Sequence, residues 1–215
     1  MIDQSLKLMA GQRRGNKIRV FNTLAVEREE PVSVEVPSSW KGKDWIAVDN
    51  RGGESPTQWI DEGEVTKLLF RAKVPSTGFA TYTFQESTSR AKGNFFVSSG
   101  CMMVGVVLES DLYSLVLNPS KGGAVESLKV RFLQDRELVD WGNGRSFNEL
   151  RGFFIEKNSF LSSTEQPATI RLMEQGPLLM KVCVQGKIGV HPFVQTIQLA
   201  QGEPRIDMHI KIDWM

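Results

Sequence analysis

The sequence predicts an all-β protein, a small β-sandwich followed by part of a larger one, and three features of the chain support this. Apolar residues recur with period two, as in residues 79–84, where Ala80, Tyr82 and Phe84 are separated by threonines. Alternation of this kind is typical of a strand with one buried face. Clusters of Gly, Pro, Asn and Asp separate the apolar runs, as turns require. A helical spacing of apolar residues stands out only in residues 1–17.

The first sandwich is expected over residues 18–86, and residues 1–17 are expected to be a short helical lead-in from a preceding domain. Strands are expected at 18–21, 32–36, 45–48, 67–74 and 79–84. The second of these has Val at every other position, with Ser33 and Glu35 between. The four residues Pro-Ser-Thr-Gly at 75–78 predict the turn between the last two strands.

A polar segment rich in Ser and Gly, residues 87–101, is expected to link this domain to a second one at 102–215. Residues 109–129 predict a hairpin around the turn Asn-Pro-Ser-Lys-Gly-Gly. Further strands are expected at 178–184, 194–199 and 205–214. In the last strand every second residue is apolar, which predicts one buried and one solvated face. The chain ends directly after this pattern, so we expect it to be a piece of a longer protein.

The charge balance and the apolar runs argue against several classes of function. Lys and Arg number 26 and Asp and Glu 25, without a basic run, which argues against nucleic-acid binding by phosphate neutralisation. Residues 101–108, the longest apolar-leaning run, are too short to cross a bilayer, so we expect no membrane partner. The first residues lack the pattern of a signal peptide. This favours a cytoplasmic location, and the compartment stays open because the true N-terminus is expected upstream.

The chain has two cysteines and two histidines, which leave little material for a disulfide framework or a metal site. Cys101 and Cys183 are expected to be unpaired thiols packed as small hydrophobes, although an oxidising compartment would allow them to pair. We expect His191 to be a satisfied surface or interdomain residue. His209 is expected to be solvated on the polar face of its strand.

Three segments resemble the β-rich region that follows the catalytic domain in family 38 α-mannosidases. Residues 18–37, IRVFNTLAVEREEPVSVEVP, resemble the family pattern VFNPL.WER…V.V, and residues 69–84, LFRAKVPSTGFATYTF, resemble LLF.A.VP..GF..Y. Residues 109–129 resemble the first hairpin of the family's large C-terminal domain, which has a galactose-mutarotase-like super-sandwich fold. The chain departs from the pattern at Ala25-Val26, where the family often has an aromatic residue.

The resemblance implies that the whole protein is a retaining α-mannosidase acting on mannose-containing oligosaccharides. This chain would brace the catalytic barrel and contribute loops near the sugar. The family's aspartate nucleophile and its zinc, held by two His and two Asp, lie in an N-terminal α/β barrel that starts from a His-x-Asp pair. Here neither His191 nor His209 begins such a pair. We therefore expect no catalytic residue, metal ligand or cofactor in this chain, and zinc only in the catalytic domain of the full-length enzyme.

Four residues are candidates for contacting the sugar: Trp141, Asn148, Glu149 and Arg151. In the family, the stretch equivalent to residues 146–154 can reach over the barrel and line the sugar pocket. Side chains of these types donate to and accept from sugar hydroxyls, and an indole can stack on a sugar ring. In the alternative, Arg151 pairs with Glu149 and the loop packs its phenylalanines into the sandwich. These are Phe147, Phe153 and Phe154.

A second class of function stays open, a stand-alone carbohydrate-binding or adhesive β-sandwich module without enzyme activity. Such a module would present exposed indoles on which sugar rings stack. The candidates for that platform are Trp40, Trp45 and Trp59, which we expect instead to pack in the core or between domains. A free-standing module should bind sugar unaided, whereas the β region of a mannosidase should bind it weakly or not at all.

Overall fold

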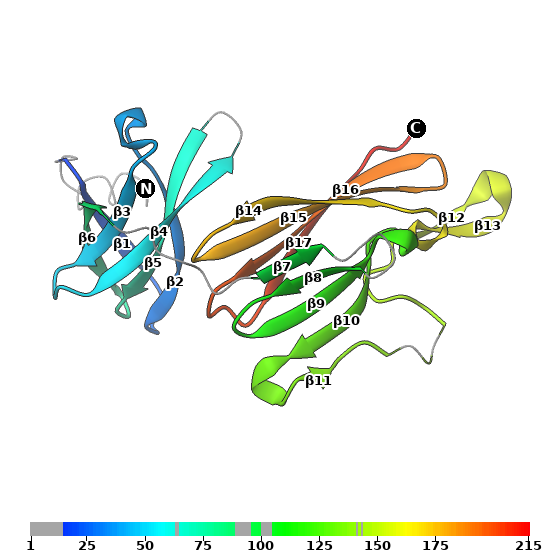
Figure 1. Ribbon diagram of the computed structural model, residues 1–215, viewed down its shortest axis with the longest axis horizontal. Helices are drawn as coiled ribbons and strands as arrows, with labels where there is room; N and C mark the ends of the chain where they lie inside the picture. The colour runs from blue at the N-terminus through cyan, green and yellow to red at the C-terminus, as the bar shows by residue number, and fades with distance from the viewer. Residues whose placement is uncertain (1–14, 63–64, 89–95, 100–104, 141, 143) are drawn as a thin grey trace. The chain divides into compact units, whose positions relative to one another are not determined.

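The computed structural model describes residues 15–62, 65–88, 96–99, 105–140, 142 and 144–215. The regular elements of these residues are β-strands and short 3₁₀ turns (Figure 1), which confirms the prediction of an all-β sandwich protein. The described residues include no helix long and apolar enough to span a bilayer. The chain divides into two compact units, Met1–Lys92 and Gly93–Met215. Most of the helical lead-in expected at 1–17 lies outside the described residues.

The described residues of the first unit form a six-stranded antiparallel sheet in the order β1-β6-β3-β4-β5-β2. Its strands are β1 (Lys17–Asn22), β2 (Arg28–Glu35), β3 (Asp44–Asp49), β4 (Glu54–Glu62), β5 (Val65–Val74) and β6 (Gly78–Ser87). The first residues of β4 pair with β3 and the later ones with β5. The five strands predicted for this region are all present, each within a few residues of its expected bounds.

The core of this unit is built from the inward positions of β3, β5 and β6, as the alternation predicts. Its buried side chains are Ala47, Leu68, Phe70, Ala72, Val74, Tyr82 and Phe84. The valines of β2 pack against them from one side, while Ser33 and Glu35 are exposed. The Tyr82 hydroxyl donates to the carbonyl oxygen of Lys73 and accepts from its N–H, so the buried phenol is satisfied. Burial raises the pKa of Tyr82.

Strand β4 is absent from the sequence prediction. Pro56 lies near its start, and a proline argues against a central strand because it cannot donate to the ladder. In the structure Pro56 is paired with Ile46 at the end of the short β3–β4 ladder, where β4 passes over to β5. Buried Ile60 then lies in the half of β4 that pairs with β5.

The second unit is a sandwich of two antiparallel sheets with a separate hairpin. One sheet has the order β11-β10-β9-β8-β7, and the other β14-β15-β16-β17. The first comprises β7 (Phe96–Ser99), β8 (Val106–Glu109), β9 (Tyr113–Asn118), β10 (Ala124–Val130) and β11 (Arg136–Glu137). The second comprises β14 (Thr169–Gln175), β15 (Leu179–Ile188), β16 (His191–Ala200) and β17 (Ile206–Ile212). The hairpin consists of β12 (Arg151–Phe154) and β13 (Ser159–Ser162), which pair with each other.

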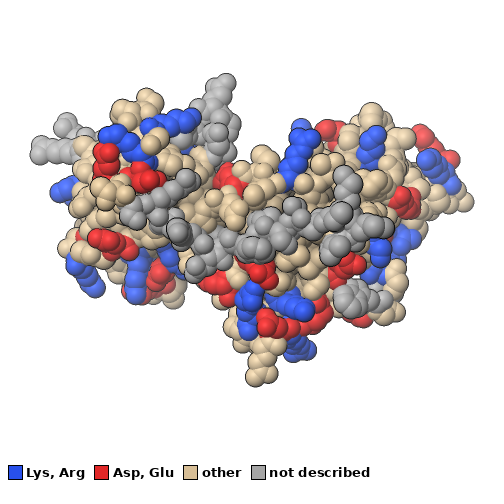
Figure 2. Space-filling view, in the orientation of Figure 1, with Lys and Arg blue, Asp and Glu red and all other residues tan. Residues whose placement is uncertain are grey.

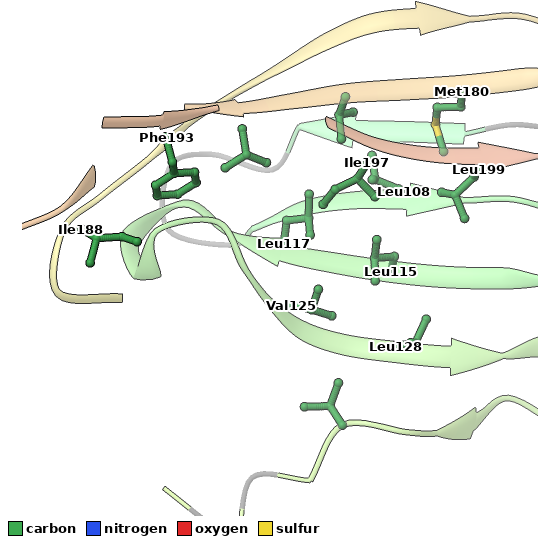
Figure 3. Packing of buried hydrophobic residues seen from close by; sticks show 13 residues of the cluster. Leu108, Leu115, Leu117, Val125, Leu128, Met180, Ile188, Phe193, Ile197 and Leu199 are labelled. Carbon is green, nitrogen blue, oxygen red and sulfur yellow. The ribbon is translucent and has the colours of Figure 1, made fainter. Parts of the chain in front are cut away.

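The core of the second unit lies between its two sheets (Figure 3). Strands β8, β9 and β10 contribute Leu108, Leu115, Leu117, Val125 and Leu128, and β15 and β16 contribute Met180, Val182, Val184, Ile188, Phe193, Ile197 and Leu199. Because these residues come from alternate positions of each strand, the two inner faces interdigitate as in other sandwiches. Cys183 is a buried free thiol in β15, and Cys101 lies outside the described residues.

Several strands of this unit differ from the sequence prediction, and β12 and β13 were not predicted. Strand β7 lies inside the segment expected as a linker and pairs with β8, and β14 was not predicted. Strand β17 is present, but the apolar face that was predicted to be buried is buried only in part. Ile210 is partly exposed and Trp214 lies beyond the strand, mostly exposed. Among the described strands β17 lies at the edge of its sheet, beside β16, so fewer neighbouring side chains cover its apolar face than cover β15 and β16.

Candidate functional site

The stretch expected to approach the sugar, residues 146–154, runs along the sandwich and then leaves it in the β12–β13 hairpin. It begins with a single bridge in which the N–H of Val125 donates to the carbonyl oxygen of Phe147. Leu150 then exchanges two hydrogen bonds with Ser163, which follows the hairpin. These two hydrogen bonds join the two ends of the hairpin to each other at its base.

Asn148 is held by the second sheet of the sandwich. Its backbone is left-handed, with φ of 63°, a conformation that Asn tolerates better than most residues. Its amide exchanges two hydrogen bonds with the amide of Gln195 in β16, at 3.2 and 3.1 Å. Gln195 is 2% exposed, so this pair satisfies a polar group inside the core. The amide of Asn148 is thus occupied in a structural contact.

Glu149 and Arg151 make separate local contacts. A carboxylate oxygen of Glu149 accepts from the N–H of Ser146 at 3.3 Å, which closes a turn. The guanidinium of Arg151 lies 4.7 Å from the ring centroid of Phe160 across the hairpin, a cation–π contact. The alternative interpretation, in which Arg151 pairs with Glu149, is therefore wrong.

The phenylalanines of this stretch do not all enter the core. Phe154 packs against the core cluster, but Phe147 and Phe153 are exposed. The prediction that all three pack into the sandwich is wrong for those two. Phe153 has its side chain on the outer face of the hairpin, and period two allows only one face of the strand to pack inward. Trp141 lies outside the described residues, and contact of any of the four candidates with sugar stays a prediction.

His191 is buried, at the start of β16. Its Nδ1 accepts from the N–H of Met215 at 3.0 Å, and its ring stacks on Phe154 at 5.3 Å. Trp214 covers the same ring at 5.0 Å. The expectation of a satisfied histidine is confirmed, in an aromatic cluster rather than at the surface. His209 is exposed on β17, as predicted.

The described residues do not fit the zinc that the family resemblance implies for the whole enzyme. They contain no group of three His, Cys, Asp or Glu side chains close enough to hold an ion. One nitrogen of His191 already accepts a backbone hydrogen bond, and its ring is packed between aromatic side chains.

The indoles of the first unit are packed, as expected. Trp40 and Trp45 stack at 3.9 Å between centroids and, with Trp59, lie against the core. The indole N–H of Trp45 donates to the carbonyl oxygen of Trp40, and that of Trp59 to Lys43. These three side chains are therefore partly buried in a packed cluster and do not form a free stacking platform.

The first unit also has a small cavity beside β1 and β2, of about 110 Å³. Its lining includes Phe21, Asn22 and Arg28. The Asn22 amide nitrogen donates to the carbonyl oxygens of Val26 and Pro75, so its polar group is used within the loop. Pockets for organic ligands are typically several times larger. The cavity therefore does not identify a sugar site.

Two carboxylates have pKa values below their usual range. Burial alone would raise the pKa of Glu137, but the Ser127 hydroxyl and the N–H groups of Val139 and Leu128 donate to its carboxylate and outweigh that effect. Hydrogen bonds from the backbone of Gly53 lower the pKa of Asp49 in an exposed turn. Both carboxylates hold turns together.

Basic and acidic side chains lie interspersed on the face of each unit seen in Figure 2.

Sequence reasoning missed two residues of this region, Gln195 and Phe160. The signal for Gln195 is its register, because it alternates with Phe193, Ile197 and Leu199 on an inward face. A polar residue in that register requires a buried partner. Phe160 gave no such signal, since its contact with Phe153 depends on a hairpin that periodicity alone does not predict.

We expect the Asn148–Gln195 amide pair to be energetically coupled. Gln195→Met should destabilise the second unit by about 1–2 kcal/mol, because it leaves the Asn148 amide unpaired. Asn148→Gly keeps the left-handed backbone accessible. In the double variant the two losses should fall short of their sum by about 1 kcal/mol. Hydrogen exchange of the β16 amides measures all three.

The matched control is Asn158→Gly. Asn158 is also left-handed, with φ of 45°, but it is exposed at the tip of the hairpin. The substitution should change stability by less than about 0.5 kcal/mol, alone or combined with Gln195→Met. Strict additivity of the Asn148 and Gln195 substitutions would show that the amide pair contributes no coupling.

The fold and the site define the chain as an all-β protein of two units, the second a two-sheet sandwich with an aromatic hairpin at its margin. No family model matches the sequence, and no curated protein matches it.

Two solved structures share this fold. An α-mannosidase from Enterococcus faecalis V583 matches with a TM-score of 0.56 and 9% identity, over 91% of this chain and 29% of its own. A glycosyl hydrolase family 38 protein from Enterococcus faecalis matches with a TM-score of 0.59 and 8% identity, over 91% of this chain and 31% of its own. The chain thus spans about 30% of the length of these structures. At this identity the matches show a common fold.

Proposed function

We propose that this chain is the non-catalytic β region of a retaining family 38 α-mannosidase that hydrolyses α-mannosides. The observation that carries the proposal is the fold match over 91% of the chain to about 30% of an α-mannosidase and of a family 38 protein. The resemblance of residues 18–37 and 69–84 to the family pattern supports it independently of the fold. In this proposal the second unit is the first part of the galactose-mutarotase-like super-sandwich.

The role of the chain in the proposed enzyme is to brace the catalytic domain and to place loops near the sugar. Packing of Leu150, Phe154 and Leu161 against the core holds the β12–β13 hairpin on the sandwich, which suits a scaffold for a neighbouring surface. The nucleophile, the acid/base carboxyl and zinc belong to the catalytic domain. Glycoside hydrolysis requires two carboxylates that flank the scissile bond. Among the described residues, the two carboxylates with a lowered pKa, Asp49 and Glu137, accept hydrogen bonds that hold turns together.

The test is hydrolysis of an aryl α-mannoside with added zinc, comparing these 215 residues with the longer polypeptide encoded in the same reading frame. Activity only in the longer protein is the expected result. Activity in the 215-residue chain would place catalysis here and overturn the assignment. Silence in both, together with tight binding of a mannose oligosaccharide by the short chain, would instead establish the carbohydrate-binding module.

A further inference from the structure

The β12–β13 hairpin has an aromatic face on its outer side. Phe153 and Phe160 stand directly opposite each other in the ladder, and Arg151 precedes Phe153 by two positions on the same side. The two rings are 5.2 Å apart, and the Arg151 guanidinium lies over Phe160. We call these three residues, with Ile155 at the tip, the aromatic face.

The aromatic face is exposed although it is apolar. Phe153 is 50% exposed, Phe160 56% and Ile155 86%. The opposite side of the hairpin is already occupied, because Phe154 and Leu161 pack against the core cluster. Because the side that carries Phe154 and Leu161 faces the core, the side that carries Phe153 and Phe160 faces away from it. The hairpin therefore has apolar residues on both sides, and only one side is covered. An exposed apolar patch of this kind is typical of an interaction surface.

We propose that the aromatic face is the docking surface for a further domain of the same polypeptide, the glycosidase domain of the longer protein. This inference rests on the proposed function. The partner surface would present apolar side chains to Phe153 and Phe160 and a carboxylate to Arg151. Within the described residues the Arg151 guanidinium contacts a ring and no carboxylate, so its charge is available for such a pair.

Size favours a tethered domain over a separate partner. A stable complex between separate proteins buries about 800 Å² on each side, far more than these four side chains offer. A tethered domain needs less, because the linker raises its effective concentration to about the millimolar range. More than two thirds of each matched structure lies outside the region shared with this chain, which is enough additional polypeptide for such a domain in those proteins.

Chemistry favours a protein surface over a sugar. The two rings are inclined at 68°, and the guanidinium covers one side of Phe160. A flat platform for a pyranose ring is therefore lacking in this part of the hairpin. Aromatic residues and Arg are the side chains that protein interfaces enrich at their centres. The four residues of the aromatic face thus fit a docking contact better than a sugar subsite.

The test is hydrogen exchange of residues 151–162 in the longer polypeptide, with and without the paired substitution Phe153→Ser and Phe160→Ser. The paired variant should exchange at least about tenfold faster there, which corresponds to roughly 1.4 kcal/mol of lost docking. Phe132→Ser is the matched control, since Phe132 is equally exposed but lies in a 3₁₀ turn beyond β10. It should leave the exchange of the hairpin unchanged.

Five results would overturn the docking proposal. Two concern the longer protein: unchanged hairpin exchange in its paired variant, and a reading frame that encodes only these 215 residues. Two concern the 215-residue chain: faster exchange already in its paired variant, and dimers that the substitutions abolish. The fifth is a spectral shift of the Phe rings with α-methyl mannoside. Mannoside hydrolysis in the same samples separates the two proposals, because a docked but inactive protein fails only the proposed function.

Discussion

Replacing Gly122 by alanine is expected to destabilise the second unit by about 2–5 kcal/mol. Gly122 has φ of +62°, and a Cβ at this position would lie 2.1 Å from the carbonyl oxygen of Ser163. A side chain therefore meets two costs, a left-handed backbone and a collision with backbone that cannot rotate away. The sequence predicts the turn at this position, and the structure adds the close approach that requires glycine.

The matched control for this prediction is Gly144→Ala. Gly144 also has a left-handed backbone, with φ of +70°, but nothing lies within 4 Å of a Cβ there. Gly144→Ala should cost only the free energy of holding an alanine in a left-handed backbone, about 1 kcal/mol. Urea unfolding and hydrogen exchange of the β9 and β10 amides measure both variants. Equal losses at the two glycines would show that the contact with Ser163 is not a constraint.

The Gly122 contact bears on the candidate site because Ser163 also holds Leu150. The chain thus connects the β9–β10 turn, through Ser163, to the residue directly before Arg151. We expect Gly122→Ala to raise hydrogen exchange at the base of the hairpin as well as in β10. The β9–β10 turn thus lies close to the base of the hairpin that carries the aromatic face.

Periodicity in the sequence was sufficient for most of the first unit and much of the second. The strands with strict alternation, such as β2 and β6, lie where they were predicted, because one buried face imposes period two on the side chains. Strand β4 was not predicted because Pro56 interrupts the apolar alternation. At this point β4 stops pairing with β3 and begins to pair with β5. Phe132 follows the alternation of β10 but is exposed, since the chain turns into a 3₁₀ segment there.

The candidate region could be predicted from the sequence only as a segment, not as an arrangement of side chains. Asn148 meets Gln195 at a separation of 47 residues, and that pairing is set by how the sheets pack. Arg151 faces Phe160 because of the hairpin register. Local patterns carry no information on either contact, which is why the residue types were identified and their partners were not. The family resemblance supplied the functional hypothesis that periodicity alone could not.

Phe70→Ala is expected to destabilise the first unit by about 3–5 kcal/mol. Phe70 is fully buried, and its ring makes edge contacts with Tyr82 at 4.9 Å and Phe84 at 5.2 Å. Removing the ring leaves a cavity among side chains from β5 and β6, and it removes one aromatic contact from each of the two neighbours. Hydrogen exchange of the β5 and β6 amides measures the stability of this unit alone. A single unfolding midpoint for the whole chain would combine the stabilities of its two units.

The control is Phe79→Ala in the same unit. Phe79 is on β6, exposed, with a looser ring contact to Phe21 at 5.7 Å. Its truncation should cost no more than about 1 kcal/mol, since little apolar area returns to water. Similar losses for both substitutions would mean that the β5–β6 face is not the core of the unit. A loss at Phe70 alone would show that the alternation in residues 69–84, the segment that also carries the family resemblance, is maintained by packing.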